Sequence, residues 1–306
     1  MNKFIRNTLI VFAIMFGIGL VCLISGGVLG GFEQVIKLGN SGKLSWTLDP
    51  THFDNFGYLD YSGQVRHYPV IDDEYLIDDY ENAVDKSEIS EICVRMAAGS
   101  LTVDHSNDDM VHISETNIPS LHCYLEDDIL YIYADKKPGE CSDGRKLNIE
   151  LPKDIILTNY DVSMGAGESY IKQINAEEID IELGAGNMVI DHVETDYFNG
   201  RVGAGSLSIE DGKVGEMQCD IGMGNFYYEG SVTDDTSVKC AMGRADIRLT
   251  EAEEYFNYHL SAAMGNVSIG KQDFGGLASD RVIYHDADRD FRVECAMGGI
   301  NIAFID

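Results

Sequence analysis

Short strands dominate the hydrophobic pattern of the larger, C-terminal part of the chain. Before Gly186, apolar residues alternate with polar ones, as at Ile179 and Ile181. After this glycine the apolar positions move by one residue, to Met188 and Ile190. Alternation with period two indicates a half-buried strand, and a shift of parity at a glycine indicates a bend. The pattern predicts a strand, a glycine corner, a second strand and a polar turn.

This unit recurs along the chain. Five of its glycines follow each other at intervals of 19 residues: Gly167, Gly186, Gly205, Gly224 and Gly243. A unit of this size cannot bury its apolar face alone, whereas stacked units can. We therefore predict an all-β fold, a parallel β-solenoid of about 19-residue coils with Gly corners. A β-sandwich of meandering hairpins is the alternative, although it explains neither the constant corner nor the constant interval.

The residue before each corner glycine is always alanine or methionine, from Ala98 to Met297. Because it shares the parity of the apolar strand positions, we expect it to point inward and to form one internal ladder. Residues 104–160 interrupt the series, and we expect longer, irregular first coils there. Their strands are predicted around 111–113, 129–133 and 147–151.

The N-terminus has the pattern of a membrane anchor. Residues 8–29 are apolar or small without a charge, and 22 helical residues span about 33 Å, enough for a bilayer core of about 30 Å. Lys3 and Arg6 precede this segment and favour a cytoplasmic N-terminus. Residues 1–31 are therefore predicted as a cytoplasmic tail and single transmembrane helix. A cleaved signal peptide and a buried helix of a soluble protein are the alternatives.

Residues 32–87 are predicted to form an acidic stalk between this anchor and a solenoid domain at 88–306. The acidic residues are densest from Asp72 to Glu81 and have no defined ligand spacing. A solvated, self-repelling spacer is the simpler interpretation, and a weak divalent-cation or partner-binding strip is the alternative.

Charge narrows the choice of partners. The chain carries 22 Lys and Arg against 52 Asp and Glu, a net charge of -30. Nucleic acids and anionic lipid surfaces need a basic patch, so no nucleic-acid partner is expected. The N-terminal helix would provide the membrane attachment, and the C-terminal domain is expected outside the cytoplasm.

No catalytic, cofactor-binding or metal-binding residues are predicted. The nearest approach to a metal site is a cluster around His105, namely Asp104, Asp108, Asp109 and His112, which we interpret as a polar turn. Asp286, Asp288 and Asp290 resemble part of a calcium loop but lack its glycine and terminal glutamate. On a strand they would share one solvent face.

Apart from Cys22, which lies in the apolar N-terminal segment, the cysteines divide into two groups. Cys219, Cys240 and Cys295 occupy inward strand positions and are expected to be small core residues. Cys93, Cys123 and Cys141 could include one disulfide if the domain lies outside the cytoplasm, although their number also suits a reducing compartment.

Several segments together resemble a known family. They are the first corner at 98–103, the strand Leu130-Tyr131-Ile132, the segment Ile149-Glu150-Leu151-Pro152-Lys153 and the later glycine corners. Across residues 88–304 the chain is similar to the bacterial putative-adhesin domain of unknown function, a β-strand-repeat family of cell-envelope proteins. The resemblance implies a parallel β-solenoid that is usually tethered to a membrane, and it supplies no functional residues.

The function expected from these observations is a non-catalytic structural or binding role at the cell envelope: adhesion, envelope organisation or stress sensing. A polysaccharide-processing enzyme on a β-helix and a membrane-bound cytoplasmic scaffold are the alternatives. An envelope glycan or protein would bind the outward strand residues of the solenoid: Asp180, Glu182, Arg201, Gln218, Asp220, Lys239 and Glu294.

Overall fold

The computed structural model describes residues 57–59, 65–67, 83–119, 121–134, 144–275 and 279–305. The chain divides into two units, Met1–Tyr75 and Leu76–Asp306. In the first unit, β1 (Gly57–Leu59) and β2 (Val65–His67) pair antiparallel. The predicted anchor at 8–29 lies outside the described residues, and among those described no helix has the length and apolarity to cross a membrane.

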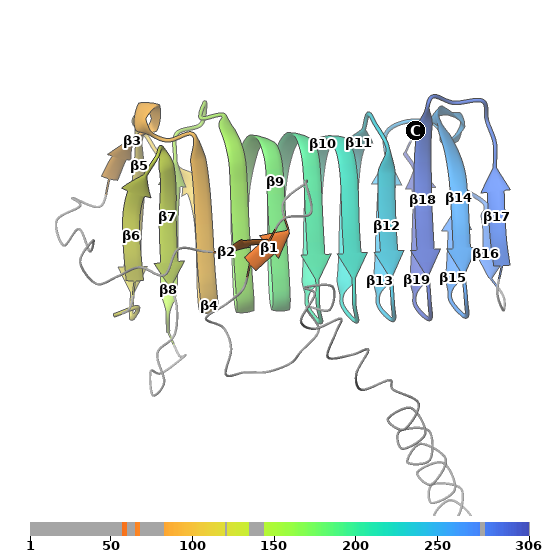
Figure 1. The fold of residues 1–306 in the computed structure, drawn as a ribbon, viewed down its shortest axis with the longest axis horizontal. Helices are drawn as coiled ribbons and strands as arrows, with labels where there is room; N and C mark the ends of the chain where they lie inside the picture. The colour runs from red at the N-terminus through yellow and green to blue at the C-terminus, as the bar shows by residue number, and fades with distance from the viewer. Residues whose placement is uncertain are drawn as a thin grey trace, which may run out of the picture. The chain divides into compact units, whose positions relative to one another are not determined.

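The second unit is a stack of β-coils (Figure 1). Its strands, in chain order, are β3 (Ala83–Asp85), β4 (Glu91–His105), β5 (Met110–Thr116), β6 (Leu121–Glu126), β7 (Ile129–Ala134), β8 (Lys146–Leu151), β9 (Leu157–Val202), β10 (Ser206–Ile221), β11 (Asn225–Val232), β12 (Thr236–Cys240), β13 (Arg244–Leu249), β14 (Phe256–Ala262), β15 (Asn266–Ile269), β16 (Gln272–Gly275), β17 (Ser279–Ile283), β18 (Arg289–Cys295) and β19 (Gly299–Phe304). Two 3-10 turns, Lys86–Glu88 and Glu253–Tyr255, complete the set.

Parallel pairing confirms the predicted solenoid. Ser206 of β10 pairs with Asn187 of β9 on one side and with Asn225 of β11 on the other, an offset of 19 residues each time. The same chain segment therefore returns to the neighbouring position once per coil. Among the described strands of this unit, hairpin pairing, which a meandering sandwich requires, is confined to short strands near the two ends of the stack.

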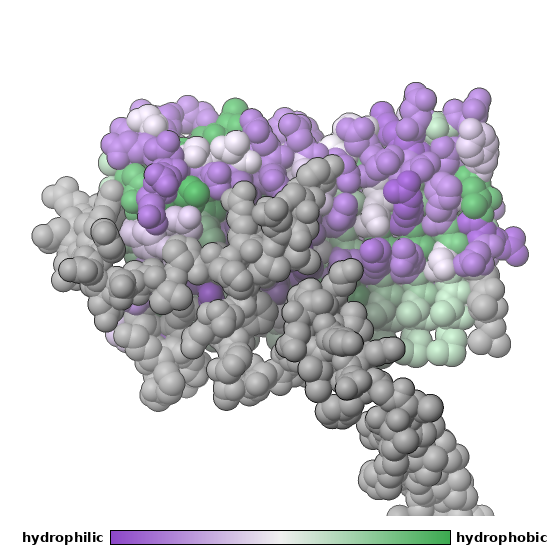
Figure 2. Space-filling model, viewed as in Figure 1, coloured by the Kyte–Doolittle hydropathy of each residue, from purple (hydrophilic) through white to green (hydrophobic). Residues whose placement is uncertain are grey.

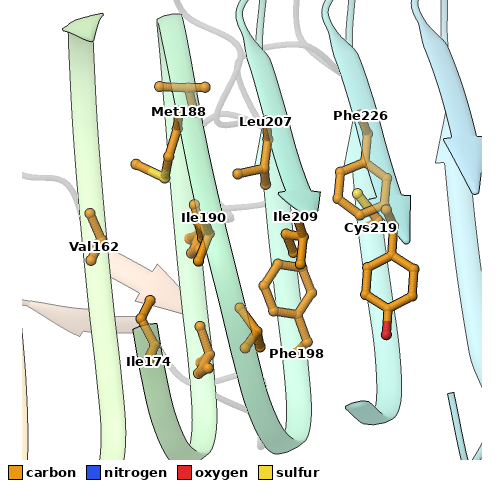
Figure 3. Close-up of a cluster of buried hydrophobic side chains, with 14 of the residues drawn as sticks. Val162, Ile174, Met188, Ile190, Phe198, Leu207, Ile209, Cys219 and Phe226 are labelled. Carbon is orange, nitrogen blue, oxygen red and sulfur yellow. The ribbon is translucent and has the colours of Figure 1, made fainter. Parts of the chain in front are cut away.

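Each coil contributes one strand to each of two facing sheets, and the core lies between them. Inward residues of successive coils form ladders, such as Ile190 beside Ile209 and Leu207 beside Phe226. Figure 3 shows these side chains stacked between the two sheets of the solenoid. All four are essentially inaccessible to solvent. The period-two pattern of the sequence thus creates a continuous apolar core.

The order of coils in space departs from chain order at the N-terminal end. The coil made by β7 and β8 pairs with one side of β4, while β9 pairs with the other side. After β4, the chain therefore forms the coil of β7 and β8 on the side of β4 toward the N-terminal end of the stack, and then crosses to the other side of β4 to form β9. The predicted strands around 111–113, 129–133 and 147–151 are confirmed as β5, β7 and β8.

A similar inversion occurs at the C-terminal end. β12 and β13 pair with β18 and β19, and these pair in turn with β14 and β15, which precede them in the sequence. The later coil is thus inserted between two earlier ones. This explains why the interval between corner glycines changes after Gly243, because Gly298 stacks on Gly243 and Gly265 stacks on Gly298.

The corners need glycine because neighbouring coils approach closely there. A Cβ atom on Gly243 would lie 2.0 Å from the carbonyl oxygen of Gly224 and 2.8 Å from a methyl carbon of Ile221. The side chain three residues before one corner glycine therefore occupies the space beneath the glycine of the next coil. Gly167 and Gly186 additionally adopt positive φ values of 131° and 150°, which side chains rarely tolerate.

The predicted orientation of the residue before the glycine is wrong. Ala166, Ala185 and Ala204 are exposed, as are the methionines at the equivalent position of later coils. The physical reason is the packing just described: the side chain three residues before the glycine already fills the interior of the corner. The residue directly before the glycine therefore lies on the outside of the bend.

Candidate binding surfaces

The predicted surface residues lie on two neighbouring ladders of the sheet that precedes the corners, and Gln218, paired with Asn199 and Ser237, belongs to the second one together with Asp180. Arg201 is opposite Asp220, Asp220 is opposite Lys239, and Lys239 is opposite Glu294. Glu182 precedes Arg201 by one 19-residue coil. The outward face predicted from the sequence is therefore continuous, although it spans several strands that are distant along the chain.

Charges alternate along the first of these ladders. Glu182, Asp220 and Glu294 alternate with Arg201 and Lys239, so that each basic side chain lies between two acidic ones. Opposite charges on directly opposite residues stabilise neighbouring strands. The alternation of charges therefore has a structural role, because it helps to hold neighbouring strands together. The charge of the ladder is nearly balanced, although the chain as a whole is strongly acidic.

Two carboxylates on this face are less exposed than their neighbours. Asp180 and Glu182 are half-buried, and burial raises the pKa of both carboxyl groups above the usual value. Asn199 opposes the effect at Asp180, because its Nδ2 donates a hydrogen bond to Oδ1 at 2.5 Å. Arg201 acts in the same direction on Glu182 by charge attraction.

The corner edge is a second, different surface that the sequence pattern did not reveal. Figure 2 shows a pale green apolar band along the lower edge at the right, where β12, β14 and β18 end. Alanine and methionine side chains are exposed along this edge: Ala241, Met242, Ala263, Met264, Ala296 and Met297. We call the exposed methionines at this edge, Met223, Met242, Met297 and Met264, the methionine ridge. Strand parity predicted that these methionines point inward, so the sequence pattern alone could not reveal this surface.

The side chains of the cluster around His105 do not form one common site. Asp108 binds Nε2 of His112 at 2.9 Å, while Asp104 binds Nζ of Lys172 at 2.7 Å. Asp109 makes a separate ion pair with Lys86 at 2.8 Å. The acidic side chains are thus paired with different partners on the surface of the N-terminal coils.

The three aspartates at 286–290 do not share a strand face as expected. β18 begins at Arg289, so Asp286 and Asp288 lie in the preceding loop. The carboxylate of Asp290 lies 3.1 Å from Nη2 of Arg292 and 3.5 Å from Nε2 of His259. Throughout the described part of the chain, no group of three His, Cys, Asp or Glu side chains is arranged to hold a metal ion.

The inward cysteines are core residues, as predicted. Cys219, Cys240 and Cys295 are buried free thiols, and Cys240 is stacked on Cys295 of the neighbouring coil. Cys123 is also a free thiol, and burial raises its pKa to about 12. Cys141 lies outside the described residues.

Two small cavities lie in the described part of the chain. One apolar cavity, lined by Val84, Ile113 and Leu130 among others, measures about 40 Å³. Ligand pockets are usually about 300–1,000 Å³. Neither of these cavities is large enough for such a ligand, so we consider the sheet face before the corners and the corner edge as surfaces for recognition.

A stack of parallel 19-residue coils with flat exposed faces defines the class of this domain as a β-solenoid. The family model of the Toastrack domain, DUF4097, matches residues 84–302. The chain therefore belongs to the Toastrack family, which confirms the predicted resemblance to the putative-adhesin family of unknown function.

The chain also matches solved structures from several bacteria. A protein described as a putative adhesin from Bacteroides fragilis has 16% identity and a TM-score of 0.47, covering 72% of this chain and 94% of that one. One described as a putative lipid binding protein from Parabacteroides distasonis has 15% identity and a TM-score of 0.40, with coverage of 72% and 94%. A putative cell adhesion protein from Clostridium sporogenes has 13% identity and a TM-score of 0.33, with coverage of 72% and 96%. None of the curated proteins compared with the chain matches it.

Proposed function

We propose that this protein is a membrane-anchored, extracytoplasmic β-solenoid with a non-catalytic binding role at the cell envelope. The observation that carries the proposal is the continuous outward ladder of the sheet face, which presents Arg201, Asp220, Lys239 and Glu294 on successive coils. Solenoids use such extended surfaces to bind extended partners. An envelope glycan or protein segment that follows the long axis of the stack fits this face.

The distribution of carboxylates supports a binding role over hydrolysis. A glycosidase needs two carboxyl groups that flank one bond, about 5–10 Å apart. Along the ladder from Arg201 to Glu294 the acidic residues alternate with basic ones, and the cavities seen among the described residues, about 40 and 10 Å³, are too small to enclose a sugar. The surface therefore suits attachment better than chemistry on a bound substrate.

The orientation across the membrane is supported by the N-terminal pattern and by charge. Lys3 and Arg6 precede the apolar segment at 8–29, and every acidic residue of the chain follows it. The buried thiols are compatible with an oxidising compartment, because Cys219, Cys240 and Cys295 pack as small apolar side chains. Free cysteine in this core therefore does not require a reducing environment.

Protease shaving of intact cells tests the topology. The cells would carry the full chain with an epitope tag after Asp306. If the domain lies outside, full-length tagged protein disappears without lysis, because we expect the protease to cut in the acidic segment before the solenoid. Protection until lysis would overturn the proposed orientation and favour the cytoplasmic scaffold.

A charge-reversal experiment tests the binding face separately. Asp220→Lys combined with Lys239→Asp preserves the net charge, yet inverts the pattern that a partner would meet at these two coils. We expect this variant to lose retention on isolated envelope material while it stays folded, with a melting temperature only slightly below that of the wild type, because the exchange places like charges opposite Arg201 and Glu294 at exposed positions. Unchanged retention would show that the sheet face is not the binding surface.

A further inference from the structure

The methionine ridge consists of neighbouring rungs of one backbone ladder. The N–H of Met242 donates to the carbonyl of Gly222 at 2.8 Å, that of Met297 to Ala241 at 2.7 Å, and that of Met264 to Ala296 at 2.7 Å. The spatial order is therefore Met223, Met242, Met297, Met264, although it is not the order in the sequence. Adjacent strands of a sheet are about 4.8 Å apart, so four thioethers occupy a short row.

These side chains point into solvent. Their exposed fractions are 60% for Met223, 52% for Met242, 52% for Met297 and 61% for Met264. Side chains exposed to this degree contribute little to the core. Packing therefore does not explain why large apolar residues stand at this position in four successive coils.

Methionine is the one large apolar residue type used along this edge. Interior ladder positions use isoleucine, valine, leucine, phenylalanine, methionine and cysteine, whereas the four large side chains on the corner edge are all methionine. The equivalent position in the other four coils is alanine: Ala98, Ala166, Ala185 and Ala204. A requirement for apolarity alone would be met by leucine, so the common feature is the thioether sulfur.

We propose that the methionine ridge is a binding site for a soft monovalent metal ion of the copper(I) class. Thioether sulfur is a ligand that selects copper(I) over hard cations such as calcium and magnesium, which prefer oxygen. Metal–sulfur bonds are about 2.3 Å long in zinc thiolates, so two bonds of this length span about 4.6 Å, close to the spacing of adjacent coils. Flexible methionine side chains supply the remaining adjustment.

Electrostatics around the ridge favour a cation. The protein carries a net charge of -30, which raises the local concentration of cations and repels anionic surfaces. Arg244, beside the corner, is held by Asp246 through hydrogen bonds of 2.6 and 2.9 Å. Neutral thioethers can bind a cation there without first losing a proton, unlike the buried thiols of Cys240 and Cys295.

Silver(I) is a suitable probe because it shares the preference of copper(I) for thioethers and undergoes no redox change on binding. The full chain, purified in detergent and labelled with 13C at the methionine methyl groups, would be titrated with silver nitrate and followed by NMR. Of the eleven methionines, we expect the four ridge signals to shift in a saturable manner. The signals of buried Met188 and Met217 should stay unchanged, and calcium should shift none.

A quadruple Met→Leu variant at 223, 242, 264 and 297 separates metal binding from apolar docking, because leucine keeps the apolar surface and removes the sulfur. We expect it to melt like the wild type and to lose saturable silver binding and competition with a copper(I) chelator under anaerobic conditions. Met188→Leu with Met217→Leu is the matched control and should bind as the wild type does. If the quadruple variant melts early, Met242→Leu alone should still weaken binding. Ridge signals that silver leaves unmoved, or undiminished binding in both ridge variants, would overturn the proposal.

Discussion

At the scale of single residues, three thiols lie inside the solenoid on two inward ladders. Cys240 pairs directly with Cys295 in the next coil, whereas Cys219 pairs with Val238. Each lies where other coils place isoleucine or leucine, and the sulfur of Cys240 fills the space beneath Gly298. Burial raises the pKa of all three thiols. These cysteines are therefore protected both from solvent and from ionisation.

We expect Cys123, Cys219, Cys240 and Cys295 to resist alkylation. Only thiolates react appreciably, and burial raises the pKa of Cys123 to about 12. Iodoacetamide at pH 8 should modify them only after denaturation, as mapped by mass spectrometry of labelled peptides. Rapid labelling of Cys240 in the native protein would contradict the buried ladder.

Two adjacent glycines provide a matched test of the corner. A Cβ atom on Gly298 would lie 2.2 Å from the carbonyl oxygen of Gly243, whereas on Gly299 the nearest atom is 4.0 Å away. Gly298→Ala should destabilise the protein by about 1–3 kcal/mol through overpacking. Gly299→Ala should be neutral or stabilise it by up to about 1 kcal/mol, since it restricts the unfolded chain. Thermal melts of both variants decide the matter, and equal effects would refute the close approach.

The half-buried carboxylate of Asp180 gives a pH-dependent expectation. Burial raises its pKa in the folded state, so the native protein binds more protons than the unfolded chain between the usual value, about 3.9, and the raised value. Ionised Asp180 is therefore unfavourable at neutral pH, and this cost disappears as the pH falls through the raised pKa. Relative to Asp180→Asn, the wild type should gain stability on acidification, as measured by melting temperature from pH 7 to pH 4. Asp220→Asn is the control at an exposed position. If the difference in melting temperature between wild type and variant changes equally with pH for Asp220→Asn, the effect comes from net charge and not from the burial of Asp180.

At the scale of elements, the alternating ladder ties neighbouring strands together. Lys239 of β12 lies between Asp220 of β10 and Glu294 of β18. Lys239→Glu would put three acidic side chains in a row, and like charges directly opposite each other are destabilising. We expect a loss of about 0.2–1 kcal/mol that salt reduces, because these side chains are exposed.

The exchange variant Lys239→Glu with Glu294→Lys is the control for this ladder. It restores an alternation between those two strands, although the acidic side chain introduced at position 239 would still lie opposite Asp220. Chemical denaturation at low and high salt should therefore show partial recovery. If single and double variants are equally stable, the ladder contributes nothing measurable.

The strand pairs show how far sequence reasoning reaches. The constant spacing of Gly167 to Gly243 predicted the register of β9 to β13, since equal intervals and a fixed parity leave one stacking that keeps all apolar ladders aligned. The orientation of the residue before each glycine could not be predicted. Parity describes straight strands, whereas the side chain of Ile221 or Cys240 fills the corner from a neighbouring coil.

At the scale of the whole solenoid unit, the inverted order at the C-terminal end also escaped prediction. The coil of β18 and β19 carries the same apolar pattern as that of β14 and β15, and either could stack on β12 and β13. The segment between these coils determines the order. Its strands β17 and β16 pair antiparallel with β14 and β15, respectively, at the outer edge of the stack. The parallel pairing of β14 with β18 and of β15 with β19 leaves no periodic signal in the sequence.

Truncation after Asp288 tests the inversion. It removes β18 and β19, which separate β14 and β15 from β12 and β13. Hydrogen exchange should show that β14 and β15 lose protection although they are still present, while β4 and β9 keep theirs. If the coils stacked in sequence order, β14 and β15 would remain protected, and this result would contradict the structure.

The inverted order also sets a sequence of events during synthesis. Coils from β9 to β13 can stack as soon as each emerges, because every new strand pairs with one made 19 residues earlier. The coil of β14 and β15 has no such partner at that moment, and its parallel neighbours appear only when β18 and β19 have followed. Pairings between distant segments form slowly. A chain whose synthesis pauses between residues 270 and 290 would therefore present an unfinished sheet edge, the kind of surface that quality-control proteases and chaperones bind.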